Sequence, residues 1–197
     1  WDLLDSQSDN YDLNGSLKSK SFEIAKCTQK YSHFRLTQTG KNHHRYDELV
    51  LSYFDIFGKS FAKNDNKCDI ESAFDPNGET AIFAKYAERS GKKFSQTGIA
   101  YVTASSGGPS NVIDVGNDYF CTKNEPNSYI EFHFPNHEIN PTGYVIKTYY
   151  DDPGYCHLKN WKFEGSKDGN KWDLLDSQSD NYDLNGEYKS KSFEITK

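Results

Sequence analysis

A segment of 26 residues occurs twice in this sequence. Residues 1–26 read WDLLDSQSDNYDLNGSLKSKSFEIAK, and residues 172–197 read WDLLDSQSDNYDLNGEYKSKSFEITK. Agreement over that length does not arise by chance, so both segments must encode the same structural element. Two interpretations stay open: the chain is a piece of a tandem array, or it is one unit cut open in its middle, with a short overlap. The copies differ only at three pairs of positions: Ser16 and Glu187, Leu17 and Tyr188, and Ala25 and Thr196.

The size and composition of the chain indicate an all-β domain that binds through its surface. A length of 197 residues suits one domain, or one and a half. Aromatic residues reach 15%, which argues against disorder and favours strands. The net charge of −6 argues against a duplex nucleic-acid binder and against a polybasic membrane anchor, and no apolar run is long enough to span a membrane. We therefore expect neither a nucleic-acid partner nor membrane insertion.

Cysteine usage favours an intracellular over a secreted location. Cys27, Cys68, Cys121 and Cys156 are widely spaced, and the sequence has no Cys-x-x-Cys pair of the kind that marks a zinc site or a redox motif. We expect four free thiols in a reducing compartment, with disulfides in a secreted protein as the alternative.

Alternating apolar and polar residues, with turn signals between them, predict a series of short strands. In 129–134, for example, Ile130, Phe132 and Phe134 share one face. The residues Asn-Pro-Thr-Gly at 140–143 predict a turn. Many short strands separated by turns predict a β-sandwich or jelly roll. The expected strands are 34–39, 49–58 (a pair or one bulged strand), 129–134, 144–148, 161–163, a hairpin partner that begins at Trp172 after the turn at 165–169, and the stretch around Phe193 and Ile195.

The segment 79–89 carries conflicting signals. Its residues, ETAIFAKYAER, are good helix formers, and Gly91 would stop a helix. The same segment alternates Ile82, Ala84 and Tyr86, and a sandwich would place a strand here. We predict a strand, against the local propensity.

Three groups of residues resemble the discoidin family, also called the coagulation-factor type C family. The segment 157–172 (HLKNWKFEGSKDGNKW) is similar to the family's signature strand–turn–strand, and 127–134 is similar to its middle. The segments 34–42 and 49–58 look like the end of the same domain. The chain looks most similar to the repeat-type discoidin-like proteins of single-celled eukaryotes. The resemblance implies a galactose-binding-like jelly-roll sandwich that binds ligands through loops at one end.

The order of these motifs is rotated relative to the family, so that the C-terminal half comes first. The resemblance therefore implies that 1–62 is the C-terminal half of a discoidin-like domain, 63–80 is a linker, and 81–197 is the N-terminal part. Residues 81–171, one 26-residue copy and 27–62 together have about the size of one full domain.

The sequence contains little that indicates catalysis. It has no nucleophile elbow, no phosphate-binding loop and no dinucleotide fingerprint, and the carboxylates form no recognisable catalytic pair. We expect a protein that is not an enzyme and that carries no cofactor and no catalytic metal. Residues 10–15 (NYDLNG) imitate the first half of a calcium loop but lack its essential acidic ends, so a turn is expected there. A structural Ca²⁺ stays open as an alternative.

Two clusters of aromatic and polar residues are the candidate ligand sites. Tyrosine faces stack on sugar rings, while Asp and His bond to hydroxyls, and the same residue types also form protein-binding surfaces. The alternative is that these are ordinary surface loops. We expect a non-catalytic binding or scaffolding module, one unit of a repetitive structural protein, whose partners are proteins or neighbouring copies of itself; a glycan-binding adhesion domain is the alternative. The candidate residues are Tyr149, Tyr150, Asp152, Tyr155, His157, His43, His44, Arg45, Asn117 and Tyr119.

The duplicated segment adds one hypothesis about assembly. Only one copy can fill the strand positions of 172–197 in a folded domain, so the other copy is spare. Either copy can be the displaced one. The apolar residues exposed would be Leu3, Leu4, Phe22 and Ile24 in the N-terminal copy, or Leu174, Leu175, Phe193 and Ile195 in the C-terminal copy. Exposed β-segments recruit partners, so exchange between neighbouring molecules is expected to build a filament or array.

Overall fold

The structure is a computed structural model that describes residues 29–63, 65, 67–116 and 118–196. The first 26-residue copy, Cys27, the calcium-like loop at 10–15 and Asn117 lie outside the described residues, so the hypotheses about them remain predictions.

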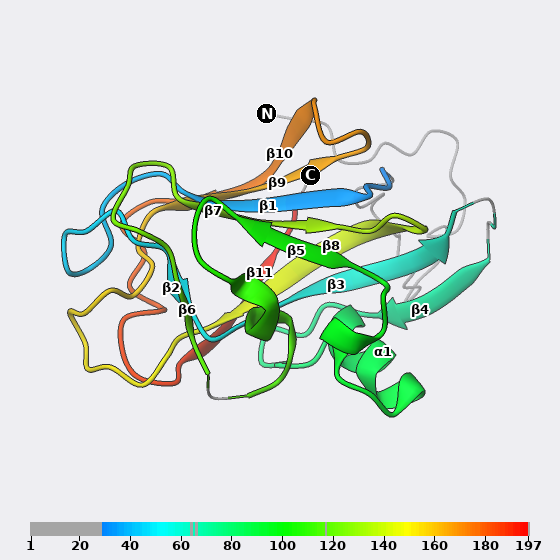
Figure 1. Ribbon diagram of the computed structural model, residues 1–197, viewed down its shortest axis with the longest axis horizontal. Helices are drawn as coiled ribbons and strands as arrows, with labels where there is room; N and C mark the ends of the chain where they lie inside the picture. Colours follow the sequence, from blue (N-terminus) through cyan, green and yellow to red (C-terminus); the bar gives the residue numbers. More distant parts are fainter. Residues whose placement is uncertain (1–28, 64, 66, 117, 197) are drawn as a thin grey trace, which may run out of the picture.

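Two antiparallel β-sheets pack face to face and form a mostly β sandwich (Figure 1). Every strand pairing among the described residues is antiparallel. One sheet has the order β10 (Trp172–Gln178), β9 (Trp161–Ser166), β1 (His33–Gln38), β7 (Tyr129–His133), β5 (Tyr101–Ala104). The other has the order β11 (Ser190–Glu194), β8 (His137–Lys147), β3 (Tyr53–Ala62), β4 (Cys68–Ser72). The remaining elements are the pair β2 (Val50–Leu51) and β6 (Phe120–Cys121), the helix α1 (Ile82–Ser90), and the 3₁₀ turns η1 (Phe94–Gln96) and η2 (Pro109–Ile113).

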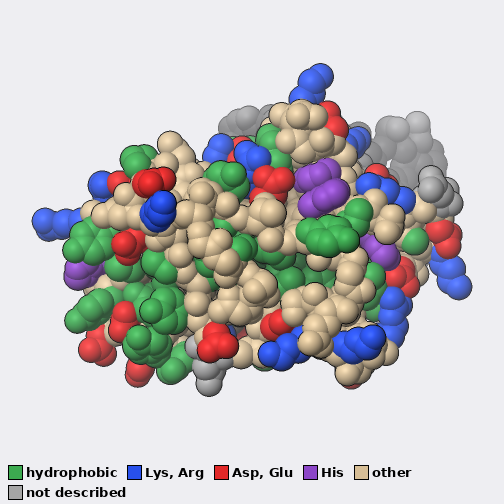
Figure 2. Space-filling model, in the orientation of Figure 1, with side chains coloured by type: hydrophobic (Ala, Val, Ile, Leu, Met, Phe, Trp, Pro, Cys, Tyr) green, Lys and Arg blue, Asp and Glu red, His purple; other side chains and the backbone are tan. Residues whose placement is uncertain are grey.

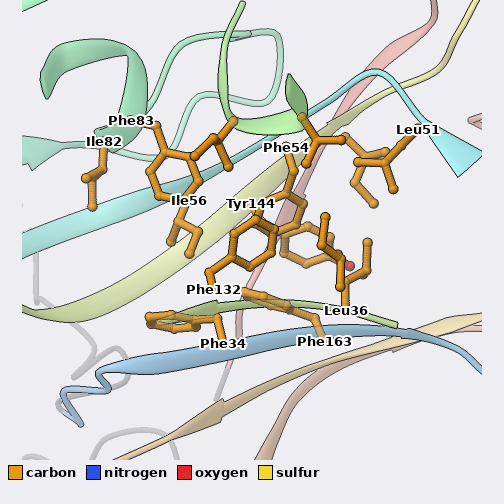
Figure 3. Close-up of a cluster of buried hydrophobic side chains, with 14 of the residues drawn as sticks. Phe34, Leu36, Leu51, Phe54, Ile56, Ile82, Phe83, Phe132, Tyr144 and Phe163 are labelled. Carbon is orange, nitrogen blue, oxygen red and sulfur yellow. The ribbon is translucent and has the colours of Figure 1, made fainter. Parts of the chain in front are cut away.

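The core lies between the two sheets and consists largely of aromatic side chains (Figure 3). The Phe54 ring stacks on the Phe132 ring of the opposite sheet, with 4.6 Å between the ring centroids. The Tyr144 ring lies 4.6 Å from that of Phe163. Each of these side chains is fully buried. Every second residue of these strands faces the core, and this alternation predicted the strands that contain the four rings, whereas β4, β5 and β6 were not predicted.

The prediction of a strand in 79–89 was wrong, because this segment forms helix α1. Ile82, Phe83 and Tyr86 share the buried face of the helix, and Gly91 ends it in a left-handed conformation (φ 64°). The first turn is capped from a distant strand. The buried carboxylate of Asp55 on β3 accepts hydrogen bonds from the backbone N–H groups of Ala81, Phe83 and Ala84, at 2.8–3.1 Å. That contact satisfies N–H groups that a helix start leaves unpaired.

The prediction of a turn at 140–143 was also wrong, because β8 runs straight through these residues. The pairing of β3 with β8 shifts register opposite this point, from Phe57↔Gly143 to Gly58↔Pro141. A bulge of this kind lets a strand contain Pro141, which has no N–H to donate. Gly58 is required on the other strand because it has φ 140° and because a Cβ there would collide with the Asn140 carbonyl.

The segment 63–80, expected to be a linker, contains strand β4. This strand pairs with β3, and Lys59 and Glu71 form an ion pair across the two strands (3.2 Å). Part of the segment therefore belongs to the second sheet.

The C-terminal copy of the repeat supplies one strand to each sheet. Strand β10 pairs with β9 at the edge of the first sheet, and β11 pairs with β8 at the edge of the second. The connection between them, residues 179–189, crosses one end of the sandwich. The repeat unit thus joins the two sheets.

Candidate functional site

Long loops gather at one end of the sandwich, on the left in Figure 1. We call this region the loop end: residues 40–48, 149–157 and 180–188, with Tyr119. Backbone hydrogen bonds tie the loops together, including His43 N–H to the His157 carbonyl (3.1 Å) and Tyr188 N–H to the Tyr149 carbonyl (3.0 Å). Segments that are far apart in the sequence therefore form one surface.

The loop 40–48 is held by the buried side chain of Asn42. Its Oδ1 accepts hydrogen bonds from the N–H groups of His44 and Tyr46, both at 3.0 Å, and its Nδ2 donates to the Glu48 carbonyl (3.1 Å). Arg45, at φ 67°, sits in the left-handed region at the tip. A tight loop with all these polar groups paired presents its remaining side chains in fixed positions.

Tyr149 and His157 form a buried support beneath the loop end. Tyr149 is 4% exposed, His157 is 0% exposed, and their ring centroids are 5.0 Å apart. The His157 Nε2 lies 2.9 and 3.1 Å from the carbonyls of Asp151 and Asp152, so this nitrogen carries the proton and donates to both. The Tyr149 hydroxyl accepts from the Cys156 N–H (3.2 Å). These two side chains fold the loop 149–157 back on itself.

Six tyrosines lie on the outside of this support, each between 42% and 62% exposed. Figure 2 shows hydrophobic side chains, tyrosine among them, gathered at this end of the molecule. Several rings contact one another. The His44 ring lies between those of Tyr46 (4.7 Å) and Tyr155 (5.4 Å), and the Tyr119 ring is 5.8 Å from that of Tyr150. The six are Tyr46, Tyr119, Tyr150, Tyr155, Tyr182 and Tyr188.

The pKa shifts of His43, Tyr119 and Cys156 at the loop end all favour the neutral form. Burial lowers the pKa of the His43 imidazole, so this ring is neutral at pH 7. The neighbouring Tyr150 raises the pKa of the Tyr119 hydroxyl. Burial, followed by the nearby Glu48 carboxyl, raises the pKa of the Cys156 thiol to about 11. The surface therefore offers aromatic faces and neutral hydroxyls together with exposed charges, some of them in ion pairs such as Lys159–Asp180 (2.8 Å).

The structure brings nearly all of the sequence-predicted site residues together. His43, His44, Arg45, Tyr119, Tyr150, Asp152 and Tyr155 lie at the loop end, whereas Tyr149 and His157 lie inside it. Sequence reasoning did not find Tyr182 or Tyr188. Both belong to the repeat, and for residues 10–15 of the other copy, which match the part that contains Tyr182, the sequence suggested only a turn.

The other described regions add no metal centre and no pair of bonded thiols. Within the described residues, no group of three or more His, Cys, Asp or Glu side chains could hold a metal ion. Cys68, Cys121 and Cys156 are free thiols. A hollow of about 560 Å³ lies elsewhere, beside α1 and η1, and its lining includes Lys92, Phe94 and Val115 but none of the sequence-predicted site residues. Among the described helices, none is both long and apolar enough to cross a membrane.

Comparisons with family models, curated proteins and solved structures give no match to this chain.

Proposed function

We propose that this chain is a non-catalytic, discoidin-like jelly-roll module that binds a protein surface through its loop end. One observation carries the proposal: six half-exposed tyrosines stand on loops whose backbone and buried side chains are fixed by hydrogen bonds. A soluble domain gains nothing in stability from leaving so many large aromatic side chains in water.

The chemistry of the loop end suits a protein partner, and a neighbouring copy of the same chain is the partner that we favour. Tyrosine gives a large contact area, loses little side-chain entropy on binding, and offers a hydroxyl for hydrogen bonds. Because the loops are already ordered, binding requires little further ordering of the backbone. The neutral forms of His43 and Tyr119 avoid the cost of desolvating charges at the contact.

A glycan-binding function is the second candidate. It is favoured by the ring of Tyr119, which stacks on that of Tyr149 (5.2 Å) beside Tyr150, with the exposed Asp152 on the same loop. Aromatic faces next to carboxylates are the combination that sugars require.

Matched tyrosine variants of the full chain separate these functions. Tyr119→Ser and Tyr155→Ser each remove one ring from the loop end, and Tyr101→Ser removes a comparably exposed ring from β5 as the control. Sedimentation over a range of concentrations measures self-association, and a glycan array followed by calorimetry measures sugar binding.

We expect wild type and the Tyr101 variant to self-associate, and both loop-end variants to do so at least about tenfold more weakly, because a central aromatic contact is commonly worth that much. Sugar binding that the loop-end variants lose would favour the second candidate. A chain that stays monomeric and binds no glycan would contradict the proposal, as would association that all three variants retain.

A further inference from the structure

The C-terminal copy of the repeat occupies a defined position on the rest of the fold. We call the surface that it covers the repeat slot: the outer edges of β9 and β8, together with the core rings that face β10 and β11. Phe193 fills the middle of this slot, where its ring lies 5.2 Å from those of Tyr144 and Trp161. Leu175, Leu184 and Ile195 are also buried in it.

Every buried position of the C-terminal copy is identical in residues 1–26. The three positions at which the copies differ, Glu187, Tyr188 and Thr196, are all exposed. The N-terminal copy therefore carries all the side chains that the slot buries. They are Leu175, Leu184, Gly186, Ser192, Phe193 and Ile195 in the C-terminal copy, and Leu4, Leu13, Gly15, Ser21, Phe22 and Ile24 in the N-terminal copy.

The polar contacts to the slot are also conserved between the copies. The Tyr144 hydroxyl donates to Asp176 (2.6 Å), and the Ser192 hydroxyl donates to the Gly78 carbonyl (2.8 Å). Asp5 and Ser21 stand at the matching positions of residues 1–26. The Arg35 guanidinium lies over the Trp172 ring of β10 (4.0 Å), and Trp1 stands at the matching position. Strands β10 and β11 also form backbone ladders with β9 and β8, which depend on conformation and not on sequence.

The chain that follows the N-terminal copy already begins beside the far end of the slot. At that end the Ile195 N–H donates to the Thr142 carbonyl on β8 (3.0 Å). Two residues away on the same strand, Asn140 Nδ2 donates to the Gln29 carbonyl (3.0 Å). Two strand residues span about 7 Å.

Ile24 corresponds to Ile195, so only Ala25–Thr28 would have to bridge that gap. Four residues can reach about 14 Å, which is twice the distance needed. An N-terminal copy placed in the slot thus joins Gln29 without moving the rest of the fold.

We propose that residues 1–26 are a second occupant of the repeat slot of their own chain, so that the domain folds in two alternative frames. In the C-frame, which the structure shows, residues 172–196 fill the slot. In the N-frame residues 1–26 fill it, and the C-terminal copy is released. Either frame completes the same two sheets, and each copy is held by one short covalent connection, 167–171 or 25–28. This inference is independent of the ligand of the loop end.

The two frames have comparable stability because they differ only at exposed positions. An exposed substitution usually changes a folding equilibrium by about twofold, so three of them change it by about tenfold. Removing one frame should therefore reduce the folding equilibrium constant by about tenfold at most. Truncating a buried Phe when no substitute exists reduces that constant by more than about hundredfold.

Phenylalanine variants of the full chain test the two frames. Phe193→Ala damages only the C-frame, Phe22→Ala damages only the N-frame, and the double variant damages both. Phe163→Ala is the control, because this fully buried residue of β9 has no second copy. Urea unfolding gives the folding equilibrium constant, and hydrogen exchange read by mass spectrometry gives the protection of amides 190–194 and 19–23. Leu replacements at the same positions provide a milder series in case an Ala variant does not fold.

We expect Phe193→Ala to lower the constant by no more than about tenfold and to transfer amide protection from 190–194 to 19–23. Phe22→Ala should leave the constant nearly unchanged, while the double variant and Phe163→Ala should lose more than about hundredfold. The inference is overturned if Phe193→Ala alone is as damaging as the double variant and 19–23 gains no protection. It is also overturned if both single variants are strongly destabilising, because the fold would then need both copies at once.

Discussion

Replacing Asp55 with Asn should strongly destabilise the domain, although the two side chains are nearly the same size. The Asp55 carboxylate is fully buried on β3. Its Oδ1 accepts from the N–H groups of Ile56 (2.7 Å) and Phe83 (2.8 Å). Its Oδ2 accepts from the Tyr53 hydroxyl and from the N–H groups of Ala81 and Ala84 (2.9–3.1 Å).

The expected magnitude follows from counting acceptors. An Asn side chain retains one of the two oxygens and points an NH₂ group, itself a donor, toward the donors on the other side. Whichever way the amide is turned, two backbone N–H groups lose their acceptor. Each buried, unpaired group costs about 1–3 kcal/mol, so the loss should be about 2–6 kcal/mol. A typical domain has about 5–15 kcal/mol of stability in total.

Urea unfolding at pH 7 gives the free energy difference, and hydrogen exchange of amides 82–90 shows whether α1 is affected first. Tyr53→Phe is the matched control. It removes one donor to the same carboxylate but leaves no backbone group unpaired, so it should cost about 1 kcal/mol. If Asp55→Asn costs no more than Tyr53→Phe, or if α1 stays as protected as before, then Asp55 does not hold the helix start and the reasoning fails.

Two further predictions concern other single side chains. Gly58→Ala should destabilise the fold by about several kcal/mol in thermal unfolding, because the new Cβ would collide with the Asn140 carbonyl and because residue 58 has a positive φ. A variant as stable as wild type would show that glycine is not needed at this bulge. Hydrogen bonds from Arg89 lower the pKa of Asp69 to about 2. The stabilisation that this pair gives should be complete above about pH 4 and lost as the pH falls toward 2. The free energy of unfolding, measured between pH 2 and 6, should therefore show this decrease in wild type and in a Glu71→Gln control. The Asp69→Asn variant should not show it.

The strands could be predicted from the sequence because the signals for them are local. The alternation of Ile130 and Phe132 with polar residues identifies the core-facing side of their strand within five residues. The strands across the core show the same local alternation. Helix α1 illustrates the opposite case. Its capping carboxylate, Asp55, lies 26 residues before Ala81, and no window around 79–89 contains it. Local propensity did favour helix there, and the expectation of an all-strand sandwich wrongly overruled it.

The residue types of the candidate site were also readable from the sequence, but their exposure was not. Tyr149 and Tyr150 are neighbours of identical chemistry, yet the first is buried and the second is half exposed. The Tyr149 ring packs against the rings of His157 and Tyr119, and the Tyr149 carbonyl accepts from the Tyr188 N–H of the repeat loop. Contacts between separate loops determine which of the two tyrosines is exposed, and no local sequence pattern encodes such contacts.

The loop end and the repeat slot meet at Tyr188, which gives the two proposals a common consequence. Tyr188 is one of the six exposed tyrosines, and Leu17 takes its place in the other copy. The preceding position carries Glu187 in one copy and Ser16 in the other. Under both proposals, the N-frame therefore presents a loop end that has lost one aromatic ring and one negative charge.

A ligand that contacts Tyr188 or Glu187 must then bind the two frames with different affinities. Linkage requires that such a ligand shift the equilibrium between the frames by the same factor. Since the frames otherwise differ by only about tenfold, a modest preference for the Tyr188 surface is enough to decide which copy occupies the slot and which is released. The two copies differ only at exposed positions. Through these positions, a ligand bound at the loop end would determine which copy of the repeat is released and exposed to neighbouring molecules.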